Sequence, residues 1–546
     1  MFLIKFIRLS LYSSLVRILF PLQLRRMKDS GTCSVCGLSF KIHLSSGTIH
    51  KHGPKAKPCE GSGLPPGDVD SASTCVSGHT SQSSAIHSQA QANSQPTVTS
   101  DHPGVISCEH PVTSRAQVKR VPKAARLACC EHLNKLIDAI IATPNNVQHW
   151  NHLFNFAPII LTKPVRGGKS HNLSSIITHR VNAWSGDGEI SQSRSAGQFS
   201  SKPRKRRSSD AVLASAVTSK LDDGNLKAAI RLISSDERPI EVSDSSFAAL
   251  QEKHPPAPTD RRNPVDPLNV QCNTLQVETI AVEGALKSFP PGSSGGPDGL
   301  TAQHIRDLLG CSAGPRLLSS LTSLVNLLLR GDLCPVVNAI LFGGRLIALR
   351  KKDGGVRPIA IGYTLRRLAA KCANFFAVNK VLSLLLPLQV GVGVPGGAEA
   401  AVHAFRRFVS NMPDGHVAVK IDFSNAFNTI RRDLILESIL TEVPEIYRFV
   451  YAAYANPSQL KFGDRIIFSC EGAQQGDPLG PFEFCLGILP LLRNLTADFS
   501  VSFMDDLTIG GPADQVSAAL NYIQDKAPVY GLRLNVSKCG IFGKAS

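Results

Sequence analysis

The chain has 546 residues, of which 42% are hydrophobic, and it carries a formal net charge of +17. This length accommodates two or three domains, and the apolar content excludes a wholly disordered protein. The basic excess favours a polyanionic partner, most simply nucleic acid. Fourteen unevenly spaced cysteines argue against a disulfide scaffold and favour a reducing compartment with one metal site.

Residues 1–26 form an apolar segment that is interrupted by Lys5, Arg8 and Arg17. The uncharged runs between these residues are too short to cross a bilayer, so we expect no stable membrane association. The segment has no small-residue cleavage site of the secretory type. Two alternatives remain for it: an organelle-targeting peptide, or a non-native stretch upstream of a true start at Met27.

Residues 27–66 contain the spacing of a small zinc finger. Cys33 and Cys36 form a Cys-x-x-Cys turn, and His52 and Cys59 follow it, with His50 as the competitor for the third position. Three thiolates and one imidazole supply the four ligands of a tetrahedral Zn²⁺ site. The alternative is a pair of free thiols near a flexible terminus.

Linkers and helical segments alternate after the finger. Residues 67–119 and 164–209 are poor in large apolar side chains, which predicts two disordered linkers, the second of them basic. Residues 120–163 have helical periodicity and predict a helical module, and residues 210–274 predict a helical N-terminal extension. The basic run 202–207 is read as a nuclear-import signal, a phosphate-binding patch or a solvated charge run.

From residue 275 to residue 546 the composition is steadily globular, and the first chemical motif is a basic hairpin. Residues 344–361 alternate as two strands around a turn at residues 353–355. Four cations lie near its tip, where they could bind one polyphosphate: Arg350, Lys351, Lys352 and Arg357. An exposed basic hairpin without a ligand is the alternative.

Two further motifs follow. Asp422 ends a short apolar strand, where a carboxylate is costly unless a cation is bound, and Phe427 lies one helical turn further on. Gln475 and Gly476 lie in a small-residue turn that opens an apolar helix, predicted over residues 481–492, and they suit close approach by a ligand.

The last motifs are an acidic hairpin and a basic strand. Residues 501–509 read as strand, tight turn and strand, with Asp505 and Asp506 at the tip. Residues 531–542 read as a turn and strand that return Lys538 towards the sheet. Paired acids at a turn are common, so their meaning depends on the order of all five motifs.

In that order, residues 340–542 resemble the fingers and palm of a reverse transcriptase, most similar to those of non-LTR retrotransposons. The stretches that carry the resemblance are residues 357–360, 421–427, 474–478, 503–506 and 531–538. The resemblance implies an α+β right-hand polymerase fold with an antiparallel palm sheet. It also implies RNA-directed DNA synthesis with an RNA template, a DNA primer or target, and deoxynucleoside triphosphates. The upstream CCHC-like zinc finger fits such elements.

The resemblance also implies a role for each residue. Asp422, Asp505 and Asp506 would bind two Mg²⁺ ions, and Lys538 would donate a proton to pyrophosphate. The remaining residues would bind the nucleotide, with Phe427 as the gate against a 2′-hydroxyl: Lys351, Lys352, Arg357, Phe427, Gln475 and Gly476. A nuclear location, with passage through the cytoplasm, follows from the basic run and the resemblance.

The chain departs from the family pattern at two points. Phe503 and Met504 replace the commoner Tyr-Ala before the acids, and Ser546 follows Asp506 by 40 residues, so we expect a domain truncated before the thumb. The alternative function is a non-catalytic nucleic-acid-binding remnant of a retroelement polymerase. A viral RNA-copying polymerase is disfavoured, because those enzymes more often have Gly before the paired acids and lack an aromatic at the position of Phe427.

Overall fold

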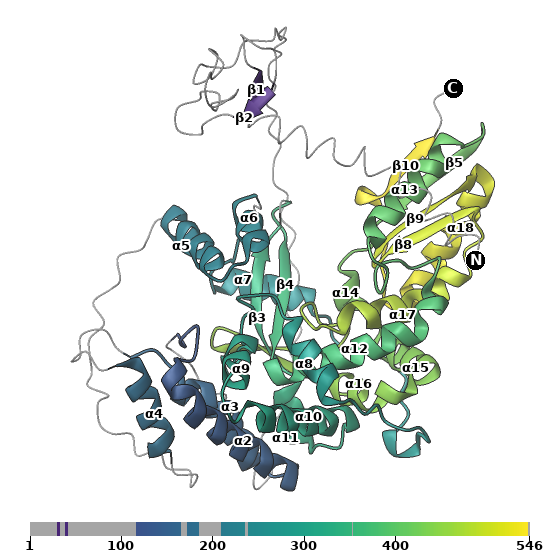
Figure 1. The fold of residues 1–546 in the computed structure, drawn as a ribbon. Helices are drawn as coiled ribbons and strands as arrows, with labels where there is room; N and C mark the ends of the chain where they lie inside the picture. Colours follow the sequence, from purple (N-terminus) through teal and green to yellow (C-terminus); the bar gives the residue numbers. More distant parts are fainter. Residues whose placement is uncertain are drawn as a thin grey trace. The chain divides into compact units, whose positions relative to one another are not determined.

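The computed structural model describes residues 30–32, 39–41, 116–164, 172–184, 209–234, 238–351 and 353–543 (Figure 1). The chain divides into two compact units, residues 1–106 and 107–546. In the first unit, β1 (Ser30–Thr32) pairs antiparallel with β2 (Ser39–Lys41). The four predicted zinc ligands lie outside the described residues.

The second unit contains a C-terminal sheet of four strands in the order β10-β5-β9-β8. Its strands are β5 (His416–Ile421), β8 (Phe499–Phe503), β9 (Asp506–Pro512) and β10 (Gly540–Gly543), and all neighbours are antiparallel. β5, β8 and β9 contain buried apolar residues, whereas Ile541 and Phe542 of the edge strand β10 are exposed. The β8–β9 connection is a two-residue turn, as the acidic hairpin predicts.

Helices pack on and beside the C-terminal sheet (Figure 1). α13 (Gly397–Ser410) contacts β8, and α18 (Ala513–Lys526) contacts β5 and β9. α14 (Ala426–Thr429) and α15 (Arg432–Glu442) follow β5 along the chain. α16 is Tyr447–Tyr454, and α17 (Gly480–Arg493) matches the apolar helix predicted at residues 481–492.

The hairpin sheet is the second four-stranded sheet, in the order β4-β3-β6-β7. β3 (Gly344–Arg350) and β4 (Val356–Gly362) form the predicted basic hairpin, and β6 (Ser458–Phe462) and β7 (Arg465–Ser469) form another. The two hairpins join through a short parallel pairing of β3 with β6. α7 (Asp244–Lys253) packs against β4 and buries Leu250 with Leu346 and Ala360.

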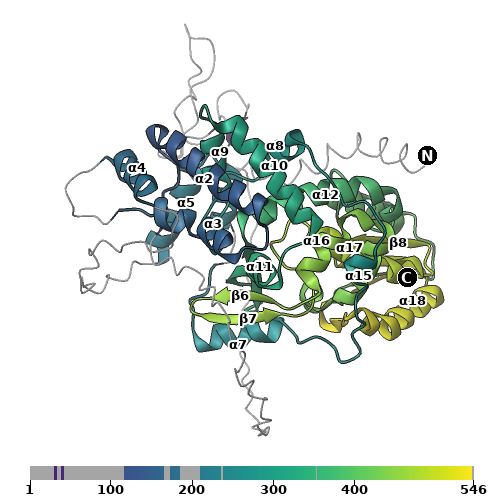
Figure 2. The ribbon, with the colours of Figure 1, turned by 90° about the horizontal axis from the view of Figure 1, so that it is seen from below.

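N-terminal helices share one core with the C-terminal sheet. They are α2 (Arg126–Ala142), α3 (Val147–Ile160), α4 (Leu173–Ala183), α8 (Thr279–Lys287), α9 (Ala302–Leu309), α10 (Gly314–Arg330) and α11 (Pro335–Leu341). Figure 2 shows α2 beside α10, and these two helices are in contact. Val121 N donates to the Asp307 carboxylate at 3.0 Å, which ties the chain before α2 to α9. The helical segment is therefore part of the same compact unit as the two sheets.

Three local expectations were wrong. The linker predicted over residues 164–209 contains α4, because Asn172 caps it and Ile177 is buried on its inner face. The linker predicted over residues 67–119 is ordered at its end, where Val118 is buried. Lys538 lies in a 3-10 turn before β10 rather than in a strand.

The other described elements are short or peripheral. α5 (Ser209–Asp222) packs against α6 (Leu226–Ser234). The 3-10 helices are η1 (Lys123–Ala125), η2 (Pro267–Asn269), η3 (Pro444–Ile446), η4 (Ala527–Tyr530) and η5 (Val536–Lys538).

α12 (Thr364–Leu385) is long and apolar enough to cross a membrane, and within the described residues it is the one single helix that is. The bent pair α10 and α11 would pass the same test as one broken span. Leu368, Ala369 and Ala370 of α12 are fully buried in the core, and core helices of soluble proteins share this composition. The feature is therefore weak support for a membrane span.

Candidate active site

A cleft of about 990 Å³ opens between the tip of the β3–β4 hairpin and the acidic end of the C-terminal sheet. Eight of the predicted site residues line it: Lys351, Arg357, Asp422, Phe427, Gln475, Asp505, Asp506 and Lys538. Lys352 lies outside the described residues, and Gly476 is not part of the lining. The structure thus brings together side chains that are up to 187 positions apart in the sequence, from Lys351 to Lys538.

Strand register places the three acids at the same end of the C-terminal sheet. β5 and β9 are antiparallel neighbours with Ile421 opposite Leu507, so Asp422 and Asp506 leave the sheet at the same end. Asp505 lies in the turn that precedes β9. Burial raises the pKa of Asp505 above its usual range, and the charges of Asp506 and Asp422 raise it further. Such crowding of carboxylates is relieved when a cation binds.

The donors at this end of the sheet are carboxylate oxygens, which are the ligands that Mg²⁺ prefers. The acids therefore fit magnesium chemically. In the described part of the chain, no three His, Cys, Asp or Glu side chains are close enough together to form a complete metal site. A bound ion would accordingly draw ligands from substrate and water as well, as Mg²⁺ usually does.

Asp506 and Asp422 differ in their polar neighbours, which are Lys420 and Asn535 respectively. Lys420 Nζ lies 3.4 Å from Asp506 Oδ1, so Asp506 already has a protein counter-ion. Asn535 Nδ2 donates to Asp422 Oδ1 at 3.0 Å, and Asn535 N donates to the Asp422 carbonyl at 2.8 Å. Asn535 therefore fixes the orientation of the Asp422 carboxylate from the turn before η5.

Cations occupy the opposite wall of the cleft. Lys351 directly follows β3, and Arg357 lies on β4. Burial lowers the pKa of Lys351, and the nearby charge of Arg357 lowers it further, which is typical of cations gathered close together.

Lys538 is held by an ion pair. Its Nζ lies 2.8 Å from Asp353 Oδ2 in the hairpin turn. The hydrogen bond from Lys538 lowers the pKa of Asp353 to about 2 and, reciprocally, raises the pKa of Lys538. A contact between two exposed side chains is weak in water, so an incoming phosphate can replace it.

Phe427 lies in the cleft wall on the short helix α14. Asn425 precedes this helix with a positive φ of 55°, and its Nδ2 donates to the Lys253 carbonyl at 2.9 Å. The Phe427 ring stacks on Phe484 of α17, with 4.5 Å between ring centroids and 14° between planes. This stacking fixes the ring and gives the cleft a rigid apolar side.

The loop before α17 packs against β4, which explains why Gly476 is absent from the cleft. The Gln475 carbonyl accepts from Ala360 N at 2.7 Å. Gly476 has a φ of 118°, and a Cβ there would lie 2.3 Å from the Ala360 carbonyl oxygen. Gly476 therefore allows close packing of two main chains, and its predicted nucleotide contact stays a prediction.

Buried ionic and polar contacts also hold the loop before α17 in place. Arg366 of α12 is 1% exposed, and its Nη2 lies 2.5 Å from Asp477 Oδ2. Arg366 Nη1 also donates to Gln474 Oε1 at 3.1 Å. Nearby, the Tyr454 hydroxyl donates to Glu483 Oε2 at 2.7 Å. These bonds position the loop without entering the cleft.

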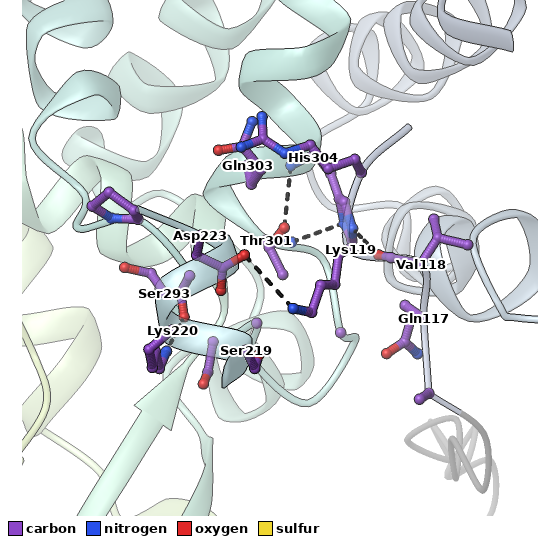
Figure 3. A pocket seen from close by; sticks show the side chains of 18 of the residues that line it. Gln117, Val118, Lys119, Ser219, Lys220, Asp223, Ser293, Thr301, Gln303 and His304 are labelled. Carbon is purple, nitrogen blue, oxygen red and sulfur yellow. Dashed lines mark hydrogen bonds and ion pairs between the residues drawn. The ribbon is translucent and has the colours of Figure 1, made fainter. Parts of the chain in front are cut away.

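A second cavity, of about 480 Å³, is lined mainly by residues 116–120 and 291–299 and by residues of α5 and α9 (Figure 3). Three of the cations in its lining have partners: Lys119 Nζ is 3.8 Å from Asp223, Lys220 Nζ donates to the Gly292 carbonyl at 2.9 Å, and Arg120 is 3.6 Å from Asp307. Figure 3 shows Lys119 extended towards Asp223 across the cavity. These contacts join separate segments of the chain and contain no acid cluster, so the cavity lacks the chemistry of the first cleft.

Several cleft residues were missed from the sequence. Lys253 ends α7 and Asp353 lies in the hairpin turn, and both line the cleft. Nothing in the pattern around Lys253 distinguishes it from a solvated helix lysine. Asn535, in contrast, lies within one of the stretches that carried the family resemblance, three residues before Lys538.

Comparison with known proteins assigns the same region. Residues 349–545 match the family "Reverse transcriptase (RNA-dependent DNA polymerase)". The chain is 26% identical, over 260 residues, to the "Retrotransposable element SLACS 132 kDa protein" of Trypanosoma brucei gambiense. That alignment covers 45% of this chain and 21% of the relative, so the chain corresponds to about a fifth of that protein.

Among solved structures, the chain is similar to apo telomerase from Candida tropicalis truncated from its C-terminal domain. The TM-score is 0.31 at 13% sequence identity, and the alignment covers 38% of this chain and 51% of the telomerase chain.

Proposed function

We propose that the chain is an RNA-directed DNA polymerase of retroelement origin, because residues 349–545 match the reverse transcriptase family. Its partners would be an RNA template, a DNA primer or target, and deoxynucleoside triphosphates. The observation that carries the proposal is the meeting of Asp422, Asp505 and Asp506 opposite Lys351 and Arg357 in one cleft. Acids that suit Mg²⁺ and cations that suit a triphosphate then face each other across the space that a nucleotide would fill.

Asp422 and Asp505 would hold two Mg²⁺ ions, which supply charge stabilisation for the attacking and leaving oxygens of a nucleotidyl transfer. Asp506 would support them from its contact with Lys420. Lys351 and Arg357 would neutralise the triphosphate, since phosphoryl transfer relies mainly on positioning and charge. Lys538 would exchange Asp353 for the departing pyrophosphate and give it a proton.

Phe427 and Gln475 would act on the sugar and base. The Phe427 ring is fixed against Phe484, so it would leave little room for a 2′-hydroxyl and would favour deoxynucleotides. Gln475 lines the cleft, and its amide can hydrogen-bond the nascent base pair.

Primer extension on an RNA template with Mg²⁺ tests the proposal. We expect deoxynucleotide incorporation by the wild type, and loss of incorporation in the Asp505→Ala variant. Asp525→Ala is the matched control, because Asp525 is an exposed acid on α18 away from the cleft lining. Nucleic-acid binding without extension above the Asp505→Ala background would contradict the proposal and favour a non-catalytic binding remnant.

We also propose that Cys33, Cys36, His52 and Cys59 bind one Zn²⁺ and that the chain acts in the nucleus. The ligand types and spacing support zinc, and β1 and β2 flank Cys33 and Cys36 in the sequence. The basic run 202–207 supports nuclear import. Zinc analysis of the wild type and of Cys36→Ser, and imaging of a chain with residues 202–207 neutralised, test the two statements. A metal-free wild type, or unchanged nuclear signal, would contradict them.

A further inference from the structure

The turn that bears Asp505 is bordered by a segment of the chain that follows α12. Residues 388–390 run parallel to the end of β8, with Gln389 beside Ser502. Ser502 N donates to the Leu388 carbonyl at 2.7 Å, and Val390 N donates to the Ser502 carbonyl at 2.9 Å. Gln389 is therefore fixed next to the last residues of β8 before the acidic turn.

The side chain of Gln389 is fully buried, and it forms hydrogen bonds with both main-chain polar groups of Met504 in that turn. Its Oε1 accepts from Met504 N at 2.8 Å and from Gly391 N at 3.0 Å. Its Nε2 donates to the Met504 carbonyl at 3.1 Å and to Ser502 Oγ at 3.2 Å. One carboxamide thus satisfies both main-chain groups of Met504.

Met504 needs such support because its backbone is in an uncommon conformation. Its φ is 58°, in the left-handed region that residues other than glycine rarely adopt. A residue keeps this strained backbone conformation only when the contacts around it stabilise that conformation. Asp505 follows immediately, so the direction of its carboxylate depends on the Met504 peptide.

Gly391 completes the arrangement by allowing close approach. A Cβ at this position would lie 2.5 Å from Met504 N and 2.8 Å from Gln389 Oε1. Ser502 Oγ adds a second donor to the Met504 carbonyl, at 2.8 Å. The polar groups around the turn are therefore satisfied by one glutamine, one serine and a neighbouring glycine without a side chain.

We propose that Gln389 is a positioning residue of the active site: its carboxamide holds the Met504 peptide so that the Asp505 carboxylate is directed into the cleft at the same end of the sheet as Asp422. This inference rests on the proposed function, in which these two acids share divalent cations. Gln389 does not line the cleft and so acts through the turn rather than on substrate.

The test compares Gln389→Met with two reference variants. Methionine has nearly the length of glutamine but cannot make the four hydrogen bonds. Leu133→Ala removes a fully buried side chain from α2, on an element that contributes nothing to the cleft lining, and reports the effect of lowered stability alone. Asp505→Asn gives the limit in which one metal-binding carboxylate is lost. Thermal unfolding is recorded for each.

Two quantities are measured: Mn²⁺ binding by electron paramagnetic resonance, and kcat and KM for deoxynucleotide in primer extension. For Gln389→Met we expect about tenfold weaker Mn²⁺ binding and a kcat about 100-fold lower, since misplacement by about 1 Å has effects of this size, with KM little changed. Leu133→Ala should leave both quantities near wild type. Ser502→Ala, which removes one of two donors to the Met504 carbonyl, should lie between wild type and Gln389→Met.

The outcomes separate this inference from the proposed function. A wild type that binds Mn²⁺ but does not extend primers contradicts the proposed function, while weaker Mn²⁺ binding in Gln389→Met still supports the positioning role. The positioning role would be overturned if Gln389→Met had the Mn²⁺ affinity and kcat of the wild type. It would also be overturned if the wild type bound Mn²⁺ no more strongly than Asp505→Asn does. If Gln389→Met does not fold, Ser502→Ala decides: unchanged Mn²⁺ binding and kcat overturn the role, and reductions in both support it.

Discussion

Glu483 gives the stability of the protein a pH dependence that one substitution should remove. This side chain of α17 is 2% exposed, and it accepts a hydrogen bond from the Tyr454 hydroxyl at 2.7 Å. Burial, with a further contribution from the charge of Asp477, raises the pKa of Glu483 to about 8. The folded protein therefore keeps a proton on this carboxyl at neutral pH, while the unfolded chain releases it near pH 4.3.

The direction of the pH effect on stability follows from this difference in proton binding. Since the folded state holds the proton more tightly, the contribution of Glu483 to the free energy of unfolding is fully present below about pH 4 and is lost as the pH rises towards 8. The loss is about 1.4 kcal/mol per pH unit within that window, or roughly 2 kcal/mol between pH 6 and pH 8. A carboxamide at this position cannot ionise, so Glu483→Gln should become more stable relative to wild type by that amount over the same interval.

Urea unfolding followed by circular dichroism at pH 6, 7 and 8 measures the effect. The comparison uses the difference in free energy of unfolding between Glu483→Gln and wild type, because other titrating groups cancel in it. Glu399→Gln, at an exposed position on α13, is the matched control and should give a difference that does not change with pH. A constant difference for Glu483→Gln as well would show that Glu483 is ionised at neutral pH and would refute the reasoning.

Three further predictions concern the loop before α17 and the cleft. Arg366→Met should reduce the free energy of unfolding by about 3–5 kcal/mol, because it leaves Asp477 buried and unpaired, and adding Asp477→Asn should restore much of the loss in urea unfolding. Gly476→Ala should destabilise by more than about 1 kcal/mol, whereas Gly224→Ala, also at positive φ but with open space around it, should cost less. Phe427→Ala should lower the preference for deoxynucleotides over ribonucleotides about 10–100-fold in competitive primer extension, and an unchanged preference would rule out the gating role.

The sequence was most informative where local pattern and chemistry coincide. The acidic hairpin and the basic hairpin were both predicted from alternation and turn residues, and both are present as β8–β9 and β3–β4. The family match at residues 349–545 confirms the resemblance that was inferred from the order of the motifs. Strand register then explains why Asp422 and Asp506 meet.

What the sequence could not predict depends on contacts between distant segments. Gln389 reads as an unremarkable residue of an apolar stretch, and its role follows from pairing with Ser502, more than a hundred positions away. Lys253 reaches the cleft because α7 packs against β4, which no local pattern encodes. The close approach of the Gly476 main chain to Ala360 of β4 is likewise a contact between distant segments.

The core shared by the N-terminal helices and the C-terminal sheet limits how the protein can be divided. Leu133, Ile137 and Ile140 of α2 are fully buried, and exposing such side chains to water costs about 1.5–3 kcal/mol each. A recombinant fragment that starts at residue 275, where the steadily globular composition begins, would leave the matching face of α10 exposed to water and prone to aggregate. The smallest soluble fragment that retains the cleft is therefore expected to begin before Val118, well upstream of every residue that lines it.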